Sequence, residues 1–190
     1  NVALYAIRGV EVGEYLKFPA TTEEIQALLS RIEIDGKKYS EIFITNFESD
    51  VLGLYDYLDE YEDIDELNHL AHVLSDLDQS DIEKLEAVID SGEYTGSVHD
   101  LINLAQNLDC YDFYPGIDSE EALGRVYIEE MEMLDVPDNV LPYFDFEAYG
   151  RDVRINDGGY VFNNGGNFVE RYHGMEDIPP EHRIFAYPKL

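Results

Sequence analysis

The spacing of apolar and polar residues predicts an alternation of short strands and helices along this chain of 190 residues. In the first 50 residues, β-branched and aromatic runs predict three strands, the last of them buried, over 2–8, 14–19 and 41–47. Residues 21–32 have the spacing of a helix, with Thr21 or Thr22 as its N-cap. An Asp-Gly pair within 34–39 predicts a turn. Together these elements predict a small α+β unit.

The middle of the chain is predicted to be helical. Three segments place apolar residues three and four positions apart, namely 63–77, 80–92 and 97–110. The apolar stripe of the first segment consists of Ile64, Leu67, Leu70, Ala71 and Leu74. Because the intervening loops are short, the helices are expected to be antiparallel neighbours in a small bundle.

The last third is predicted to mix both kinds of element again. Strands are predicted over 109–115, 151–156, 160–164 and 167–172. One helix is predicted over 118–134, with one apolar side made of Ala122, Leu123, Val126, Tyr127, Met131 and Leu134. A second is predicted over 137–150, ending at Gly150, and the tail 175–190 is expected to be an extended arm. The predicted fold class is therefore α+β.

The composition indicates a folded chain. Apolar residues make up 45% and aromatic residues 13%, which is too much core material for a disordered acidic tail. A single cysteine excludes an internal disulfide and fits a reducing compartment. No apolar run approaches the roughly 18 residues of a membrane span, and the first residues do not resemble a signal peptide.

The net charge of −30 is the most informative feature of the composition, because it is concentrated in one part of the chain. Residues 48–147 contain 29 acidic and two basic residues, whereas the other 90 residues contain 13 acidic and 10 basic ones. The extreme case is 55–67, with seven acidic residues and no basic one. Such crowding destabilises a compact state through self-repulsion, so the negative field itself is expected to have a function.

Patterns that would indicate catalysis or metal binding are weak. His69 and His72 could share a metal, but a solvated helix face explains them better. A calcium loop starting at Asp76 would lack its glycine and its final glutamate. Cys110 fits a small buried residue better than a nucleophile. Paired carboxylates without a visible partner occur at Glu129, Glu130 and Glu132. We therefore predict no enzyme, no metal and no cofactor.

The positions of the acids suggest that charge density is favoured over local stability. Glu129, Glu130, Glu132 and Asp135 crowd the C-terminal end of the helix predicted over 118–134, where the helix dipole disfavours them. Duplex DNA carries about one charge per 1.7 Å, so a charge of −30 corresponds to roughly 50 Å of duplex. A protein with carboxylates at this density could occupy a groove that binds DNA.

The segment from Leu141 to Phe162 resembles the ArdA family of antirestriction proteins, whose members carry a similar signature, Y-x-D-x-x-A-Y-G-R-D. The matching residues are Tyr143, Asp145, Ala148, Tyr149, Gly150, Arg151 and Asp152. The run from Arg125 to Val140 and the acidic run 57–68 also resemble the family, and the resemblance covers most of 2–172.

The resemblance implies an elongated DNA mimic, encoded on a mobile element and acting in the bacterial cytoplasm. It implies three domains: an α+β domain over 1–60, a helical bundle over 61–107 and an α+β dimerisation domain with a tail over 108–190. Its expected partners are a second copy and the DNA groove of a type I restriction–modification enzyme, formed by the methyltransferase core and its specificity subunit. No nucleic acid and no membrane partner is expected.

If the chain is a DNA mimic that forms a dimer, two sets of contact residues are expected. The carboxylates expected to stand in for phosphates are Asp56, Asp59, Glu60, Glu62, Asp63, Asp65, Glu66, Asp76, Asp78, Asp81, Glu83, Glu86, Asp90, Asp112, Asp118, Glu120, Glu121, Glu129, Glu130, Glu132 and Asp135. The expected dimer contacts are Tyr143, Phe144, Phe146, Tyr149, Tyr160 and Phe162. Within 55–67, the tyrosines and leucines are expected to anchor the acidic run to the body of the protein.

Other functions fit the charge equally well. The chain could inhibit a different enzyme that holds DNA in a groove, such as a CRISPR effector. It could also be an acidic adaptor or chaperone for basic nucleoid proteins. Only the signature favours restriction enzymes over these alternatives.

Overall fold

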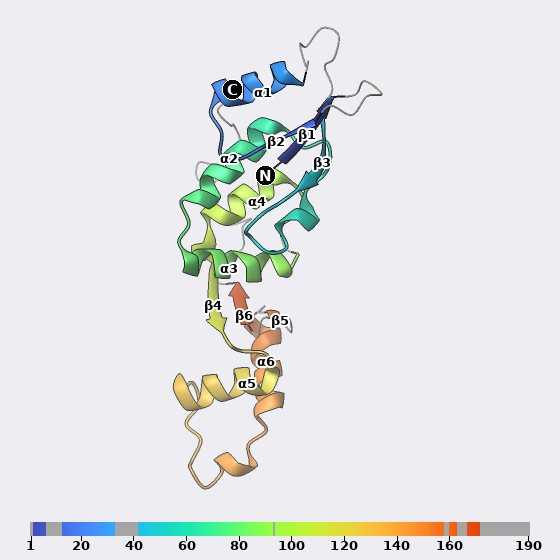
Figure 1. Ribbon diagram of the computed structural model, residues 1–190. Coiled ribbons are helices and arrows are strands. Elements are labelled where there is room, and N and C mark those ends of the chain that lie inside the picture. Colours follow the sequence, from blue (N-terminus) through green and yellow to red (C-terminus); the bar gives the residue numbers. More distant parts are fainter. Residues whose placement is uncertain are drawn as a thin grey trace. The chain divides into compact units, whose positions relative to one another are not determined.

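The computed structural model of the protein describes residues 2–6, 13–32, 42–92, 94–157, 160–162 and 167–171 (Figure 1). They combine helices with two three-stranded sheets, which confirms the α+β class. One compact unit contains the described residues up to Ile82 together with 94–106, and the other contains 83–92 and those from Asn107 onward. The division into three domains remains a prediction. The turn predicted within 34–39 and the tail 175–190 lie outside the described residues.

The sheet of the first unit has the order β2-β1-β3 and is antiparallel throughout. Its strands are β1 (Val2–Ala6), β2 (Gly13–Leu16) and β3 (Ile42–Phe47), so all three strand predictions are confirmed. β2 ends before Pro19, which has no N–H to donate to a neighbouring strand and restricts the residue before it. In β3, Ile44 is buried whereas Thr45 and Asn46 are exposed, so the strand is buried only in part.

Helix α1 (Thr22–Arg31) begins as the sequence predicts. Thr21 is its N-cap and forms a capping box with Glu24: the Glu24 N–H donates to Thr21 Oγ1, and the Thr21 N–H donates to Glu24 Oε2 at 2.8 Å. Ile25 and Leu28 make up the buried side of this helix.

Three helices follow, as predicted: α2 (Ile64–Ser75), α3 (Gln79–Asp90) and α4 (Val98–Gln106). α2 and α4 pack against each other in the first unit, whereas α3 is divided between the two units. On α2 the buried stripe includes a polar residue, Asn68, whose side-chain amide bonds both the N–H and the carbonyl of Ala20. This pairing satisfies both the oxygen and the nitrogen of the buried amide.

The second unit contains a sheet of order β4-β6-β5 and a pair of helices. The antiparallel strands are β4 (Tyr111–Pro115), β5 (Tyr160–Phe162) and β6 (Asn167–Arg171), which confirms three predicted strands. Helix α5 (Glu120–Arg125) continues into a π-helical turn over Val126–Glu130, and helix α6 spans Phe146–Asp157. Short 3₁₀ turns cover Leu54–Tyr57, Leu108–Cys110 and Leu141–Tyr143.

Three predictions for this unit are wrong. The helix predicted over 118–134 ends at Glu130, and Met131 and Leu134 are exposed instead of facing its apolar side. The helix predicted over 137–150 begins only at Phe146 and does not end at Gly150, and the strand predicted over 151–156 is instead part of the same helix, α6.

Gly150 lies within α6 and does not end it, because α5 and α6 cross at close range (Figure 1) and this position has to be small. A Cβ atom at Gly150 would overlap the carbonyl oxygen of Glu120, and one at Gly124 would overlap that of Phe146. The glycines allow this approach, beside a core of Ile117, Leu123, Tyr127 and Val153.

Candidate functional site

The carboxylates predicted to stand in for phosphates are all accessible in part or in full. None of the twenty-one is buried: fifteen are exposed and six are half-buried. The half-buried ones are Glu62, Asp65, Glu66, Asp81, Glu86 and Glu120. The twenty-one carboxylates come from both compact units, so they are not confined to one of them.

Several of these carboxylates also stabilise the backbone that carries them. Asp63 is the N-cap of α2, and its Oδ1 accepts from the N–H groups of Asp65 and Glu66. Asp78 Oδ1 accepts from the N–H of Asp81 at 2.9 Å, at the start of α3. A helix N-terminus favours negative charge, so acids at these positions support the fold while adding to the field.

Three of the predicted carboxylates lie in ion pairs with arginines. Glu120 accepts from Arg151 at 3.0 Å and from Arg154 at 2.9 Å. Arg125 bridges Glu121 and Glu129, at 2.9 and 3.2 Å. Because these arginines compensate their charge, the three glutamates are less suited to attract a basic partner than the rest of the set.

The pairing of Glu120 gives a prediction about pH. Hydrogen bonds from Arg154 and Arg151 lower the pKa of Glu120. Because the pKa is lower in the folded state, the ion pairs stabilise the fold fully above the unfolded-state pKa of about 4.3. This stabilisation is lost as the pH falls through the folded-state pKa. Glu120→Gln should therefore lower the melting temperature at pH 7, with the difference from the unmodified protein shrinking towards pH 3.

Thermal melts of both proteins at several pH values would measure this difference. Glu121→Gln is the matched control, because Glu121 pairs with Arg125 one turn away on the same exposed helix face and should change the melting temperature little. A Glu120→Gln effect that is the same at pH 3 and pH 7 would contradict the assignment.

Carboxylates at the start of α2 lie close enough to affect one another. The pKa of Glu66 is raised, chiefly by its partial burial and then by the nearby charges of Asp63 and Glu62. This crowding agrees with the self-repulsion expected from the sequence.

The aromatic residues predicted for a dimer interface differ in accessibility. Tyr143 is 88% exposed, Phe144 and Tyr149 are half-buried, and Phe146 is only 6% exposed. The Phe146 ring lies 4.3 Å from the Arg125 guanidinium and contacts the Phe144 ring edge-on. Phe146 thus has little surface left for a partner. The side chains of Tyr160 and Phe162 are outside the described part.

Sequence reasoning missed an apolar surface in the same unit. Between the π-helical turn and α6, the chain extends away from the helix pair (Figure 1) and exposes Met131, Met133, Leu134 and Val140 in addition to Tyr143. The segment is held by backbone bonds, including Met133 N–H to Tyr127 O at 2.9 Å and Val140 N–H to Pro137 O at 2.7 Å. Pro137 lies seven residues beyond Glu130, so it did not indicate that the helix ends there.

The acidic run 55–67 is only partly anchored as predicted. Tyr57 and Leu58 are half-buried and Leu67 is buried, which agrees with an anchoring role. Tyr55 and Tyr61 are 52% and 69% exposed, so for these two rings the prediction is wrong.

The signature residues from Tyr143 to Asp152 build the helix pair. Asp145 Oδ1 accepts from the Ala148 N–H at 3.0 Å at the start of α6. Gly150 allows the close approach to α5, and Arg151 bonds Glu120. Tyr149 packs edge-on against Phe144. These contacts give the signature a structural role.

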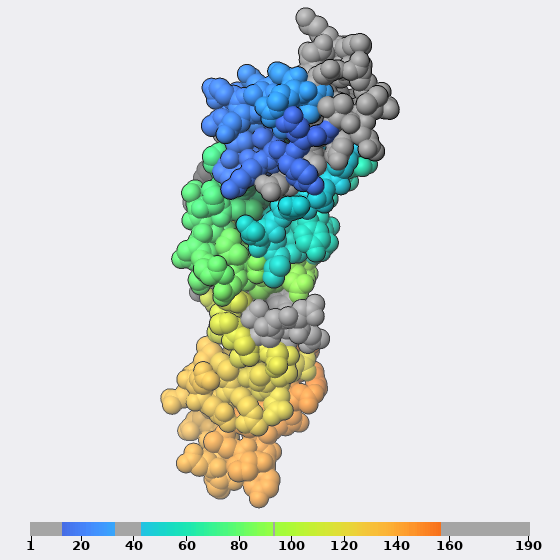
Figure 2. Space-filling view, viewed as in Figure 1, coloured from blue at the N-terminus to red at the C-terminus, as the bar shows by residue number. Residues whose placement is uncertain are grey.

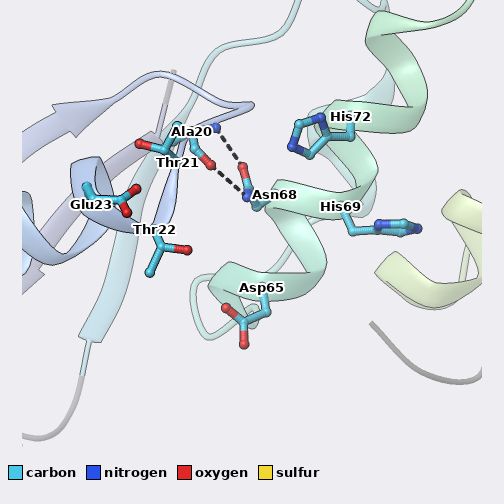
Figure 3. Close-up of a pocket in the computed structure, with 8 residues that line it drawn as sticks. All are labelled: Ala20, Thr21, Thr22, Glu23, Asp65, Asn68, His69 and His72. Carbon is cyan, nitrogen blue, oxygen red and sulfur yellow. Dashed lines mark hydrogen bonds between the residues drawn. The ribbon is translucent and has the colours of Figure 1, made fainter. Parts of the chain in front are cut away.

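A cavity of about 330 Å³ lies between the start of α1 and one side of α2 (Figure 3). It is lined by polar groups that include Glu23, Asp65 and the histidines His69 and His72. The two imidazole rings point in opposite directions in Figure 3, so they do not converge on one ion. No cluster of three or more potential metal ligands occurs among the described residues.

Cys110 is buried, as predicted, and burial raises the pKa of its thiol. The thiolate is therefore disfavoured, which argues against a nucleophilic role. Among the described helices, none combines the length and the apolar character needed to cross a bilayer.

The chain matches the model of a known protein family. The model of the ArdA family, described as antirestriction protein, matches residues 1–168. No curated protein matches the chain. The match includes the signature and all twenty-one carboxylates considered above.

Proposed function

Since this chain belongs to the ArdA family of antirestriction proteins, we propose that it inhibits type I restriction–modification enzymes by occupying the groove in which they bind DNA. The family is one of inhibitors and not of enzymes. The proposed contact is with the methyltransferase core and its specificity subunit, in the cytoplasm of a bacterial host. Both restriction and modification would then be blocked.

The observation that carries this proposal is the accessibility of the acidic set. Eighteen of its twenty-one carboxylates lie outside the arginine pairs of Glu120, Glu121 and Glu129, and every member of the set is exposed or half-buried. A protein that binds DNA gains affinity by neutralising phosphates with Lys and Arg. The same cationic groups would be neutralised by these carboxylates.

The test is a restriction assay. Unmodified phage DNA should be restricted in cells that carry a type I system and should escape when this protein is also produced. With purified components, the protein should compete with DNA for the methyltransferase core. Undiminished restriction, or binding that does not compete with DNA, would overturn the proposal. Inhibition of a CRISPR effector, or binding to nucleoid proteins instead, would favour the alternatives.

A homodimer is the second element of the proposal. Exposed apolar side chains gathered in one segment usually mark an interaction surface. The segment 131–143 has five of them, Met131, Met133, Leu134, Val140 and Tyr143. A second copy is the partner that we expect there.

Replacing Met133 and Tyr143 by Asp should therefore weaken the dimer at least tenfold, because each change puts a charge into the contact. Sedimentation velocity over a range of concentrations would measure this. Ile155→Asp, at another exposed apolar residue of the same unit, is the control and should leave the dimer intact. A monomer at all concentrations in the unmodified protein would contradict the proposal.

A further inference from the structure

The segment 52–62 carries two exposed aromatic rings and four carboxylates within eleven residues. Tyr55 and Tyr61 are more than half exposed, and so is the aliphatic Leu52. Four carboxylates lie in the same eleven residues, namely Asp56, Asp59, Glu60 and Glu62. The segment belongs to the cyan surface in Figure 2.

The rings are presented by an ordered backbone. Leu54, the first residue of the 3₁₀ turn, and Val51 before it are buried, and the Leu58 N–H after the turn donates to Tyr55 O. After the turn, Glu62 Oε1 accepts from the Asp59 N–H and Asp59 Oδ1 accepts from the Tyr61 N–H, both at 3.0 Å.

One further bond fixes the segment to the sheet. The Ile44 N–H in β3 donates to Glu60 O at 2.7 Å. Tyr61 is therefore exposed although the chain on both of its sides is hydrogen-bonded. Exposure of an aromatic ring on an ordered segment costs solvation free energy, and such rings are common at binding surfaces.

Carboxylates alone do not distinguish arginine from lysine, but exposed aromatic rings favour arginine. A guanidinium group is planar, stacks on an aromatic face and can donate two parallel hydrogen bonds to one carboxylate. The ammonium group of lysine is a strongly hydrated point charge without a face to stack. We infer that the segment 52–62 is a docking surface for arginine side chains of a basic protein partner, and that it selects arginine over lysine.

Charge decides between possible occupants. A second copy would bring the same four carboxylates against these four, which is unfavourable. An arginine-rich surface complements both the charge and the rings. This inference rests on the proposed function for the identity of the partner, since a DNA-binding groove supplies such a surface.

The test uses the full chain and two peptides of equal length and charge, nona-arginine and nona-lysine, titrated at physiological salt. The unmodified protein should bind nona-arginine several-fold more tightly than nona-lysine. Each exposed ring should contribute roughly a two- to fivefold factor in affinity. The double variant Tyr55→Ala/Tyr61→Ala should therefore lose about five- to twentyfold for nona-arginine, with less than a twofold change for nona-lysine.

Two controls identify the cause. Tyr55→Phe/Tyr61→Phe retains the rings and should retain the preference. Tyr15→Ala removes a ring that is 60% exposed on β2, outside the segment, and should change nothing. Equal affinity for both peptides, an equal loss for both in the double Ala variant, or the same loss with Tyr15→Ala would overturn the inference. The assay contains no restriction enzyme, so its failure leaves the proposed inhibition untouched.

Discussion

Neutralising six exposed carboxylates together should abolish inhibition of a type I enzyme, whereas neutralising any one of them should have little effect. The six are chosen outside the caps and arginine pairs described above: Asp76, Asp90, Asp112, Asp118, Glu130 and Asp135, each changed to Asn or Gln. A single exposed charge contact contributes at most about 1 kcal/mol, which is roughly a fivefold change in affinity. Six such losses exceed the range in which inhibition would still be measurable.

The matched control keeps the charge and changes the size. Exchanging Asp for Glu and Glu for Asp at the same six positions should leave inhibition within a fewfold of the unmodified protein. Competition with DNA for the enzyme gives the affinities, and circular dichroism establishes that each variant is folded. If Glu130→Gln alone removes all inhibition in a folded protein, recognition is local and the mimic proposal is wrong.

The second large effect is expected at the crossing of α5 and α6. Ala in place of Gly in a helix normally stabilises it by about 1 kcal/mol. At Gly124 and Gly150 the sign should be reversed, because the added Cβ would overlap backbone of the facing helix and force the pair apart. Each substitution should cost at least about 2 kcal/mol of unfolding free energy, as overpacked cores do.

Denaturant unfolding of Gly124→Ala, Gly150→Ala and Gly96→Ala would measure these costs. Gly96 is the control, because a Cβ there would lie 3.4 Å from Asp100 Oδ2, an ordinary contact. Its substitution should change stability by less than about 0.5 kcal/mol. If Gly150→Ala is neutral or stabilising, the helices are not held as closely as described.

The sequence predicts the first unit well because its signals are local. The capping box of Thr21 and Glu24 lies within four residues, and the three strands are β-branched and aromatic runs. The helices over 64–106 follow apolar spacing in the same way. The exception is Asn68, whose burial depends on Ala20, 48 positions away. Such a pairing cannot be inferred from spacing.

In the second unit the local signals and the tertiary contacts disagree. Gly150 has the local signature of a helix end, but its role is set by Glu120, thirty residues earlier. Met131 and Leu134 continue a helical spacing, but the helix has already ended in a π turn, and Glu132 adopts a positive φ of 51°. Apolar spacing predicts where a helix can form and not where it must stop.

For the acidic surface, exposure could be predicted and pairing could not. Charged side chains are seldom buried without a partner, so the accessibility of all twenty-one carboxylates follows from their chemistry. The two arginines that bind Glu120 are 31 and 34 positions away in the sequence. Only the folded helix pair shows that this glutamate is partly neutralised.

The carboxylates that cap helices have a consequence for the entropy of binding. Asp63 and Asp78 are each held through Oδ1 by backbone N–H groups, so their rotamers are selected before any partner arrives. Immobilising a freely rotating side chain on association costs about 0.5–1.5 kcal/mol. These two aspartates avoid part of that cost. In the proposed complex they would resemble phosphates on a stiff duplex more than mobile surface side chains, whose charges would have to be ordered by the partner.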